Sequence, residues 1–308
     1  MARSADAEAT AGAASSGGPS SSTSLYAIVA REAPVVIVFR RGPSREVELL
    51  RWDLETDAIE PGQWLKGRIY ERRSDLSPDG SLLVYFAAKY ETGMRTWTAV
   101  SRPPFLTALA LWPSGDAWGG GGLFESDRRL LLNHKPARMT ADPDLRPKGL
   151  EIAPLGETSG HGEDNPILHL RLVRDGWRLI DNGATDTEHG RGHPTWITFD
   201  PPVIYRRGHR RHAVELESSL EGIHERQGRW YVIGHRLRAG DRVVRDLGRT
   251  DWADWSPDGD LLIATGGRLL RLDGSSTESL RNAPLVEIAD LRPHMFEPRA
   301  APAAATHW

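Results

Sequence analysis

The sequence predicts an all-β protein, and the expected architecture is a β-propeller with six blades of four-stranded antiparallel sheet. The tetrapeptide Ser-Pro-Asp-Gly occurs at 77–80 and again at 256–259, and an apolar run follows each copy. Because proline presets the turn and Asp-Gly tolerates positive φ, each copy predicts a β-hairpin. Repeated sheet-forming units that cannot bury their faces alone are typical of propellers.

The spacing of the repeat gives the blade number. Blades of about 40 to 50 residues would fit about four times between the two tetrapeptides and about six times in the body of the chain. A degenerate copy lies at 124–132, where the turn lacks proline and glycine, and a weaker copy is expected near 196–205. Five or seven blades are the alternatives.

Short strands separated by turn signals account for most of the remaining chain. Residues 35–40 and 46–52 have the composition of two strands, and an acidic turn at 53–61 follows them. Turn signals recur through the second half at intervals that are mostly too short for helices. Almost no amphipathic helix of ten residues or more is expected, and the best short candidate is 279–283.

Composition divides the chain into a body and two tails. Residues 1–24 consist mainly of Ala, Ser, Gly and Thr, which cannot bury enough surface to offset the entropy lost on ordering, so a disordered tail is expected. One propeller domain is expected over 25–298. Residues 299–308 are rich in alanine and are expected to form a flexible C-terminal tail.

The overall composition excludes several classes of protein. The 308 residues are 39% hydrophobic and 26% charged, and the formal net charge of -3 gives no general attraction to nucleic acid or anionic lipid. The absence of cysteine excludes disulfides and thiolate metal sites. No segment approaches the roughly 20 apolar residues of a membrane span, and the N-terminus lacks a secretory apolar region, so a cytoplasmic location is expected.

The repeat resembles that of the WD40-like propellers of the TolB type. The resemblance is carried best by 252–259, Trp-Ala-Asp-Trp-Ser-Pro-Asp-Gly, whereas about 97–148 departs from the pattern. It implies a propeller from a bacterial relative of that family and, by analogy, a role in binding other proteins. Propellers of this repeat type also cap serine peptidases, but this chain contains no hydrolase domain.

The glycine run at 119–122 is the strongest candidate for a binding surface. Four consecutive glycines permit backbone paths closed to other residues, and the neighbouring tryptophans would add flat apolar surface. The alternative interpretation, which this architecture favours, is a tight crossover with tryptophans buried between blades. The predicted binding residues are Trp97, Arg102, Trp112, Trp118, Gly120 and Gly121.

Three polar clusters suggest other ligands, but each has a simpler interpretation. His189 and His193 have a metal-like spacing next to Glu188, yet the surrounding glycines and proline argue against a helix that would align them. His161, Glu163 and Asp164 lie in another polar segment; these histidines are expected in exposed loops. The basic run at 205–212 is expected to be a charged hairpin tip rather than a nucleic-acid site.

No catalytic motif of a serine hydrolase, zinc protease or nucleotide-binding enzyme is present. We therefore predict a non-catalytic scaffold or regulatory module, without cofactor or metal, that binds a protein partner through a loop-rich face. The alternatives are a hydrolase or lyase acting on a sugar or small ester at the central channel, and small-molecule binding there without chemistry. An enzyme should gather carboxylates or histidines with shifted pKa values in one pocket, whereas a scaffold should present a neutral or aromatic face.

Overall fold

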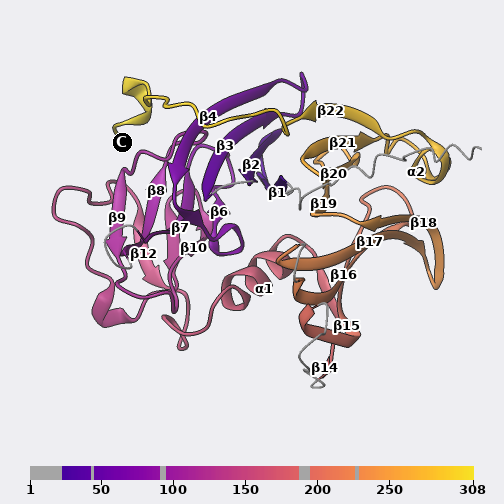
Figure 1. Ribbon diagram of the computed structural model, residues 1–308, viewed down its shortest axis with the longest axis horizontal. Coiled ribbons are helices and arrows are strands. Elements are labelled where there is room, and N and C mark those ends of the chain that lie inside the picture. The colour runs from indigo at the N-terminus through magenta and orange to yellow at the C-terminus, as the bar shows by residue number, and fades with distance from the viewer. Residues whose placement is uncertain (1–22, 43–44, 91–94, 187–194, 226–228) are drawn as a thin grey trace, which may run out of the picture.

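β-Strands dominate the protein. The computed structural model describes residues 23–42, 45–90, 95–186, 195–225 and 229–308. Over these residues the strands form five sheets that follow one another along the chain (Figure 1). Neighbouring strands are antiparallel except β11 and β12, which are parallel. The all-β prediction is confirmed.

Each sheet is built from a continuous stretch of sequence. The first contains β1 (Ser24–Val29), β2 (Val35–Arg41), β3 (Glu46–Asp53) and β4 (Ile59–Lys66). The second contains β5 (Arg68–Ile69), β6 (Asp75–Leu76), β7 (Leu83–Lys89), β8 (Arg95–Ser101) and β9 (Ala110–Pro113). The third contains β10 (Gly122–Ser126), β11 (Arg129–Leu132) and β12 (Glu151–Pro154).

The fourth and fifth sheets complete the body. The fourth contains β13 (Arg178–Asn182), β14 (Thr185–Asp186), β15 (Thr195–Gly208), β16 (Glu215–Glu225), β17 (Tyr231–Ala239) and β18 (Arg242–Arg249). The fifth contains β19 (Trp252–Trp255), β20 (Leu261–Thr265), β21 (Arg268–Leu272) and β22 (Val286–Asp290). The helices are α1 (Asn165–Arg174), α2 (Thr277–Asn282) and the 3-10 turns η1 (Glu71–Arg73), η2 (Pro136–Arg138) and η3 (Ala303–Ala305).

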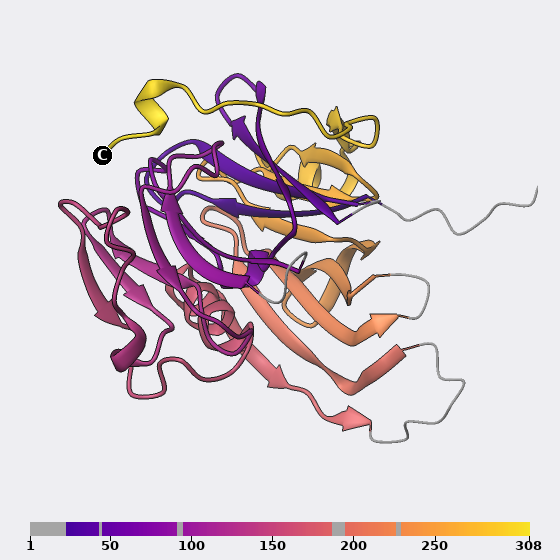
Figure 2. The same ribbon diagram turned by 60° about the vertical axis from the view of Figure 1, so that its left-hand side comes forward.

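Apolar clusters join the sheets in a series. The first sheet shares one buried cluster with the second and another with the fifth. The second also packs on the third, and the fourth packs on the fifth, beside which it lies in Figure 2. Helix α1 contacts β10 of the third sheet and β13 of the fourth, and therefore bridges the two sheets that share no cluster.

The repeated tetrapeptides form the expected hairpins. The first connects β6 to β7 and the second connects β19 to β20, with Gly80 and Gly259 at φ +74° and +99°. The degenerate copy connects β10 to β11 in the same way. The weak copy at 196–205 is wrong, because these residues form part of one long strand, β15.

Five sheets, rather than the expected six, occupy the described residues. The difference arises mainly in the fourth sheet, which extends from β13 to β18 and is longer than a blade of about 40 to 50 residues. Its strands β15 and β16 contain 14 and 11 residues. Residues that were expected to form a further sheet lengthen this one instead.

Almost no amphipathic helix of ten residues or more was expected, and α1 is one helix of ten residues. Its side chains depart from the usual amphipathic pattern: Arg171 is buried as well as Ile167, whereas Leu170 and Val173 are 41% and 49% exposed. Helix α2 overlaps the segment expected to be helical. In the part of the chain that the structure describes, no helix is long and apolar enough to cross a membrane.

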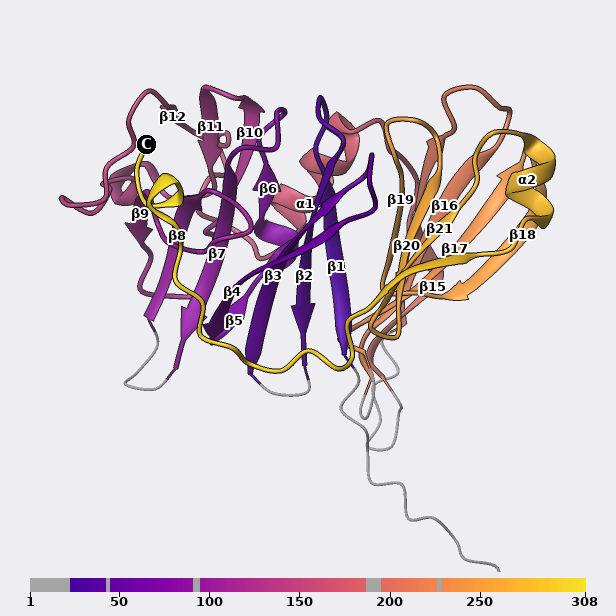
Figure 3. The same ribbon diagram turned by 90° about the horizontal axis from the view of Figure 1, so that it is seen from above.

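The chain after β22 crosses the first sheet and reaches the second and third (Figure 3). The rings of Trp64 and Phe296 lie 5.9 Å apart, and Trp308 Nε1 donates to the carbonyl oxygens of Leu109 and Arg146 at 3.0 and 3.1 Å. The segment 299–308, expected to be a flexible tail, thus contacts the body of the protein through its terminal tryptophan. The expected N-terminal tail lies outside the described residues up to residue 22, and Ser24 already begins β1.

Candidate functional site

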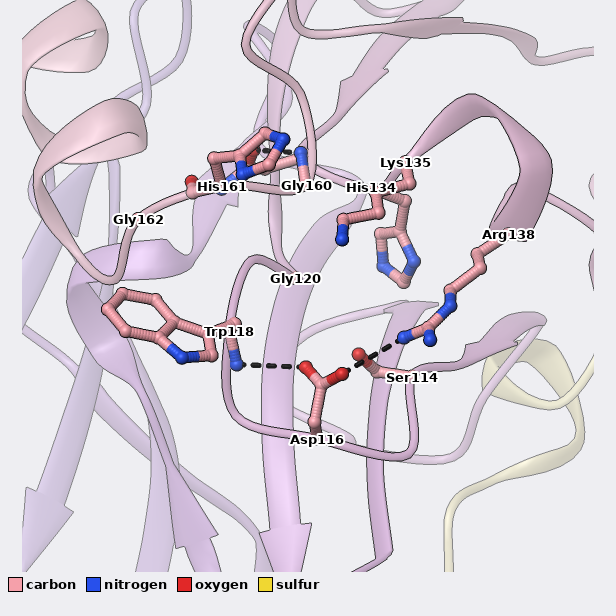
Figure 4. A pocket seen from close by; sticks show the side chains of 11 residues that line it. Ser114, Asp116, Trp118, Gly120, His134, Lys135, Arg138, Gly160, His161 and Gly162 are labelled. Carbon is pink, nitrogen blue, oxygen red and sulfur yellow. Dashed lines mark hydrogen bonds and ion pairs between the residues drawn. The ribbon is translucent and has the colours of Figure 1, made fainter.

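The glycine run borders a pocket of about 370 Å³, here called the glycine pocket. Figure 4 shows Trp118 and Arg138 on opposite sides of it, with Asp116 between them. The indole of Trp118 is 62% exposed, and Gly120 also lines the pocket. The remaining lining residues are Ser114, Asn133, His134, Lys135, Gly160, His161 and Gly162. Two of the six predicted binding residues thus meet here.

The other predicted residues lie elsewhere. Trp112 is 1% exposed and buried between the second and third sheets, while Trp97 packs against the cluster joining the first and second. Arg102 Nε donates to the carbonyl of His307 at 3.2 Å. Gly121 lies next to the pocket without lining it. The four residues thus belong to sheet packing and to the C-terminal segment.

The central glycines of the run are needed by packing. Gly120 and Gly121 both have φ near +81°, which favours glycine. A Cβ on Gly120 would lie 2.3 Å from the Phe86 ring, and one on Gly121 would lie 2.1 Å from the carbonyl oxygen of Arg73. The backbone therefore approaches the second sheet closely, rather than leaving room for a ligand at these two positions.

His134 forms the floor of the glycine pocket as a neutral side chain. Gly121 N–H donates to Thr98 Oγ1 at 2.7 Å, so the Thr98 hydroxyl can donate to His134 Nε2, which also lies 2.7 Å away. The imidazole is 3% exposed, and burial lowers its pKa to about 4. Beside it, Arg138 Nη1 pairs with Asp116 Oδ2 at 2.9 Å.

A larger cavity, of about 600 Å³, lies between α1 and the fourth and fifth sheets; we call it the α1 cavity. Its apolar wall includes Leu168, Leu172, Trp177, Phe199, Val203 and Ile233. Its polar lining includes Tyr26, Arg72, Asp164, Tyr231, His235 and Asp251. These residues come from α1, η1 and three sheets, so only the folded chain brings them together.

Arg72 is the most unusual side chain in this lining. The residue is only 7% exposed, and its guanidinium lies 3.4 Å from the centroid of the Tyr231 ring. Its Nε is buried without a hydrogen-bond partner, and the side chain forms no ion pair with any described residue. A buried guanidinium is normally paired, so Arg72 is left with unused donors.

Asp164 is held as a carboxylate by its neighbours. Arg73 Nε donates to its Oδ1 at 2.7 Å, and the Tyr231 hydroxyl donates to its Oδ2. Burial alone would raise the pKa of Asp164, but the charge of Arg73 and the bond from Tyr231 lower it overall. Burial raises the pKa of Tyr231, which keeps this hydroxyl a donor.

Two further groups in the lining are shifted by burial. His235 is 4% exposed and its Nδ1 lies 2.6 Å from Thr250 Oγ1; burial, with Arg72 and Arg229 nearby, lowers its pKa to about 3. Burial raises the pKa of Asp251, against the opposing charge of Arg229 3.3 Å away. Asp251 Oδ2 is buried without a hydrogen-bond partner.

The metal hypothesis gains no support where it can be examined. Within the described residues, no group of three or more His, Asp or Glu side chains could hold a metal ion. His161 lines the glycine pocket, and Asp164 is occupied by Arg73 and Tyr231. Glu188, His189 and His193 lie outside the described residues.

The basic run at 205–212 lies at the turn between β15 and β16, as predicted. Its side chains satisfy carbonyl groups of the second tetrapeptide turn. His209 Nε2 lies 2.9 Å from the carbonyl oxygen of Gly259, Arg210 Nη1 donates to Pro257 O at 3.2 Å, and Arg211 donates to Asp258 O. The basic run therefore stabilises the turn between β19 and β20 in the structure.

Sequence reasoning missed the α1 cavity. Arg72 precedes the first tetrapeptide in an ordinary charged segment, and Tyr231 and His235 alternate along an unremarkable strand. Of the lining residues, Glu163 and Asp164 belonged to a polar cluster that the sequence singled out, and Tyr205 begins the basic run. Comparisons with models of protein families, with curated proteins and with solved structures found no match for this chain.

Proposed function

We propose that this protein binds a small organic molecule in the α1 cavity, without chemistry. The observation that carries this proposal is a cavity of about 600 Å³ in which an apolar wall meets several buried polar groups. Ligand sites in proteins generally have volumes of about 300 to 1,000 Å³ and combine these two kinds of lining. This supports one of the alternatives weighed from the sequence.

The cavity gathers titratable groups as a ligand site does. The shifted pKa values of Asp164, Asp251 and His235 lie in one lining, which was the feature expected of an enzyme rather than of a scaffold. Asp164 and His235 are already bonded to protein partners. Their arrangement favours binding over proton transfer.

We further propose that the five sheets are the blades of a propeller-like ring related to the TolB type. The order in which they share apolar clusters, together with α1 between the third and fourth, supports this arrangement. In such a ring the α1 cavity would lie near the centre, where propellers commonly bind ligands.

A cavity-filling variant tests the proposed function. Leu168→Trp on α1 should fill the cavity, whereas Leu170→Trp on the same helix adds an indole to a side chain that is 41% exposed. A set of aromatic fragments should include several that raise the Tm of the wild type and of Leu170→Trp, but not that of Leu168→Trp. Equal shifts in both variants, or none in the wild type, would contradict binding in this cavity.

A protein partner at the glycine pocket is a second candidate, favoured by the 62% exposure of Trp118 at its edge. Exposed indoles often anchor interfaces. Affinity capture from lysate of the native cell should then yield a partner with the wild type and not with Trp118→Ala. Met295→Ala, which removes a side chain 82% exposed elsewhere, is the matched control. Equal capture by all three baits would oppose this candidate.

A further inference from the structure

We propose that the ligand of the α1 cavity is a monocarboxylate with a flat apolar body, and that Arg72 binds its carboxylate. This inference rests on the proposed function of the cavity and names the class of ligand. It is carried by three features of the lining: an unpaired buried guanidinium, the orientation imposed on it, and the charge balance around it.

The first feature is the state of Arg72. The residue is 7% exposed and lines the cavity, yet it makes neither an ion pair nor a hydrogen bond with any described residue. Leaving a cation buried without a counter-charge is unfavourable. An anion entering the cavity would supply the missing counter-charge, which a neutral acceptor would not.

The second feature is the ring beneath the guanidinium. Arg72 stacks on Tyr231 with its central carbon 3.4 Å from the ring centroid. The Tyr231 hydroxyl is already committed to Asp164, so this ring is held in place. Stacking uses the face of the guanidinium and leaves its edge for two parallel hydrogen bonds, the geometry that matches a carboxylate.

The third feature is the charge of the surrounding lining. Its buried carboxylates have their own cations: Asp164 pairs with Arg73, Asp251 with Arg229, and Asp254 with Arg207. Glu163 is also part of the lining, on an exposed part of the chain before α1. Arg72 therefore supplies one unmatched positive charge among several negative ones. That balance favours a monoanion and disfavours a phosphate dianion.

The apolar residues of the lining indicate the body of the ligand. Trp177 and Ile233 are 4% and 7% exposed, and Leu172 and Phe199 complete an apolar surface. Flat aromatic groups pack well against such side chains. The indole Nε1 of Trp177 is a second buried donor without a partner. An acceptor atom on the ligand body would suit this wall.

Matched acids and amides test the proposal with the full chain. Binding of benzoate, 2-naphthoate and indole-3-acetate would be measured by calorimetry at pH 7 beside their neutral amides. We expect the acids that bind to do so about tenfold or more tightly than the amides, because only they can form charge-assisted bonds with Arg72. Arg72→Met should abolish this preference and leave amide affinity within about twofold.

Arg68→Met is the matched control, because Arg68 also stacks on an aromatic ring, that of Tyr70 at 4.4 Å, but does not line the cavity. It should retain the full preference for acids. Equal affinity of acids and amides for the wild type would overturn the anion proposal while leaving cavity binding intact. A preference that survives Arg72→Met would overturn the role of Arg72.

If Arg72→Met does not fold, the affinities of the wild type for acids and amides still test whether the cavity prefers an anion. In that case Arg72→Lys, which keeps the charge but lacks the planar fork, should lower the preference for acids without removing it. If none of the six compounds binds the wild type while other fragments satisfy the Leu168→Trp test, this inference fails and the proposed function stands. Failure of both experiments would refute both the proposed function and this inference.

Discussion

His235 is kept neutral in the wall of the α1 cavity, and this makes the fold sensitive to acid. In the unfolded chain the imidazole titrates near its ordinary pKa of 6.5, whereas burial lowers the value to about 3 in the folded protein. Between these values the unfolded state binds more protons than the folded state. Stability is therefore complete above the unfolded pKa and is lost as the pH falls.

We expect wild-type stability to fall from pH 7 to pH 5, with about 2 kcal/mol of the loss due to His235. His235→Gln cannot charge, so its free energy of unfolding should fall less over the same range. Urea unfolding at pH 7, 6 and 5 measures the difference. His161→Gln, at an exposed histidine, should follow the wild type. Parallel curves for the wild type and His235→Gln would contradict a buried neutral imidazole.

At the residue scale the sequence identified part of the glycine pocket and none of the apolar wall of the α1 cavity. Trp118 and Gly120 were found because a glycine run and tryptophans are visible as a local pattern. Arg72 was not found because its isolation depends on Tyr231 and on the pairing of distant carboxylates with other arginines. Such properties arise only from long-range contacts.

Individual elements were predictable where a turn carried the signal. The tetrapeptides at 77–80 and 256–259 gave two hairpins, since their turn chemistry is local. Helix α1 was missed because Arg171 and Arg174 face the protein while Leu170 and Val173 face solvent. Hydrophobic periodicity alone therefore assigns the wrong face of this helix to the core, or does not predict a helix at all.

The C-terminal segment shows how one side chain can outweigh composition. Trp308 packs on the cluster joining the second and third sheets, and its single Nε1–H is shared between the carbonyl oxygens of Leu109 and Arg146. Trp308→Ala should lower the free energy of unfolding by about 1 to 3 kcal/mol. Amide exchange in β9, which adjoins Leu109, should become faster.

Met295→Ala provides the control, because this side chain is 82% exposed on the same segment. Its effect should remain within about 0.5 kcal/mol. Denaturant unfolding of both variants and the wild type would make the comparison. If Trp308→Ala behaves like Met295→Ala, the segment contributes nothing to the stability of these sheets.

On the scale of the whole molecule, α1 connects sheets that otherwise lack a common core. Arg174 near its end pairs with Asp75 of β6 through Nη1 and Nη2, and Asp75 also accepts from the backbone N–H of Phe124 in β10. The carboxylate is fully buried, and its charge raises the pKa of Arg174 against the effect of burial. One ion pair thus joins α1 to the second and third sheets.

Arg174→Met should leave the Asp75 charge buried without its cation and lower stability by about 3 to 5 kcal/mol. Adding Asp75→Asn should recover part of this loss. Arg178→Met breaks a pair with Glu215 in which the arginine side chain is 63% exposed, and it should cost at most about 1 kcal/mol. Thermal and urea unfolding compare the three variants. Equal effects of Arg174→Met and Arg178→Met would show that α1 does not depend on this pair.

The number of sheets illustrates why whole-molecule features were harder to predict. The repeat marked three hairpins, but it carried no information about the length of the fourth sheet or about α1 between sheets. Strand lengths such as that of β15 are decided by pairing with β16 across the fold. Local turn chemistry cannot reveal them.

The tetrapeptide hairpins share one position that is not part of the turn. Asp75 and Asp254 each stand two residues before the serine of their tetrapeptide, and they bind Arg174 and Arg207 respectively. In the degenerate copy Phe124 holds this position, and its carbonyl oxygen accepts from Arg174 at 2.9 Å. The repeat therefore specifies a position that binds an arginine as well as a turn. In the degenerate copy, which has no aspartate at this position, the backbone carbonyl oxygen binds the arginine instead.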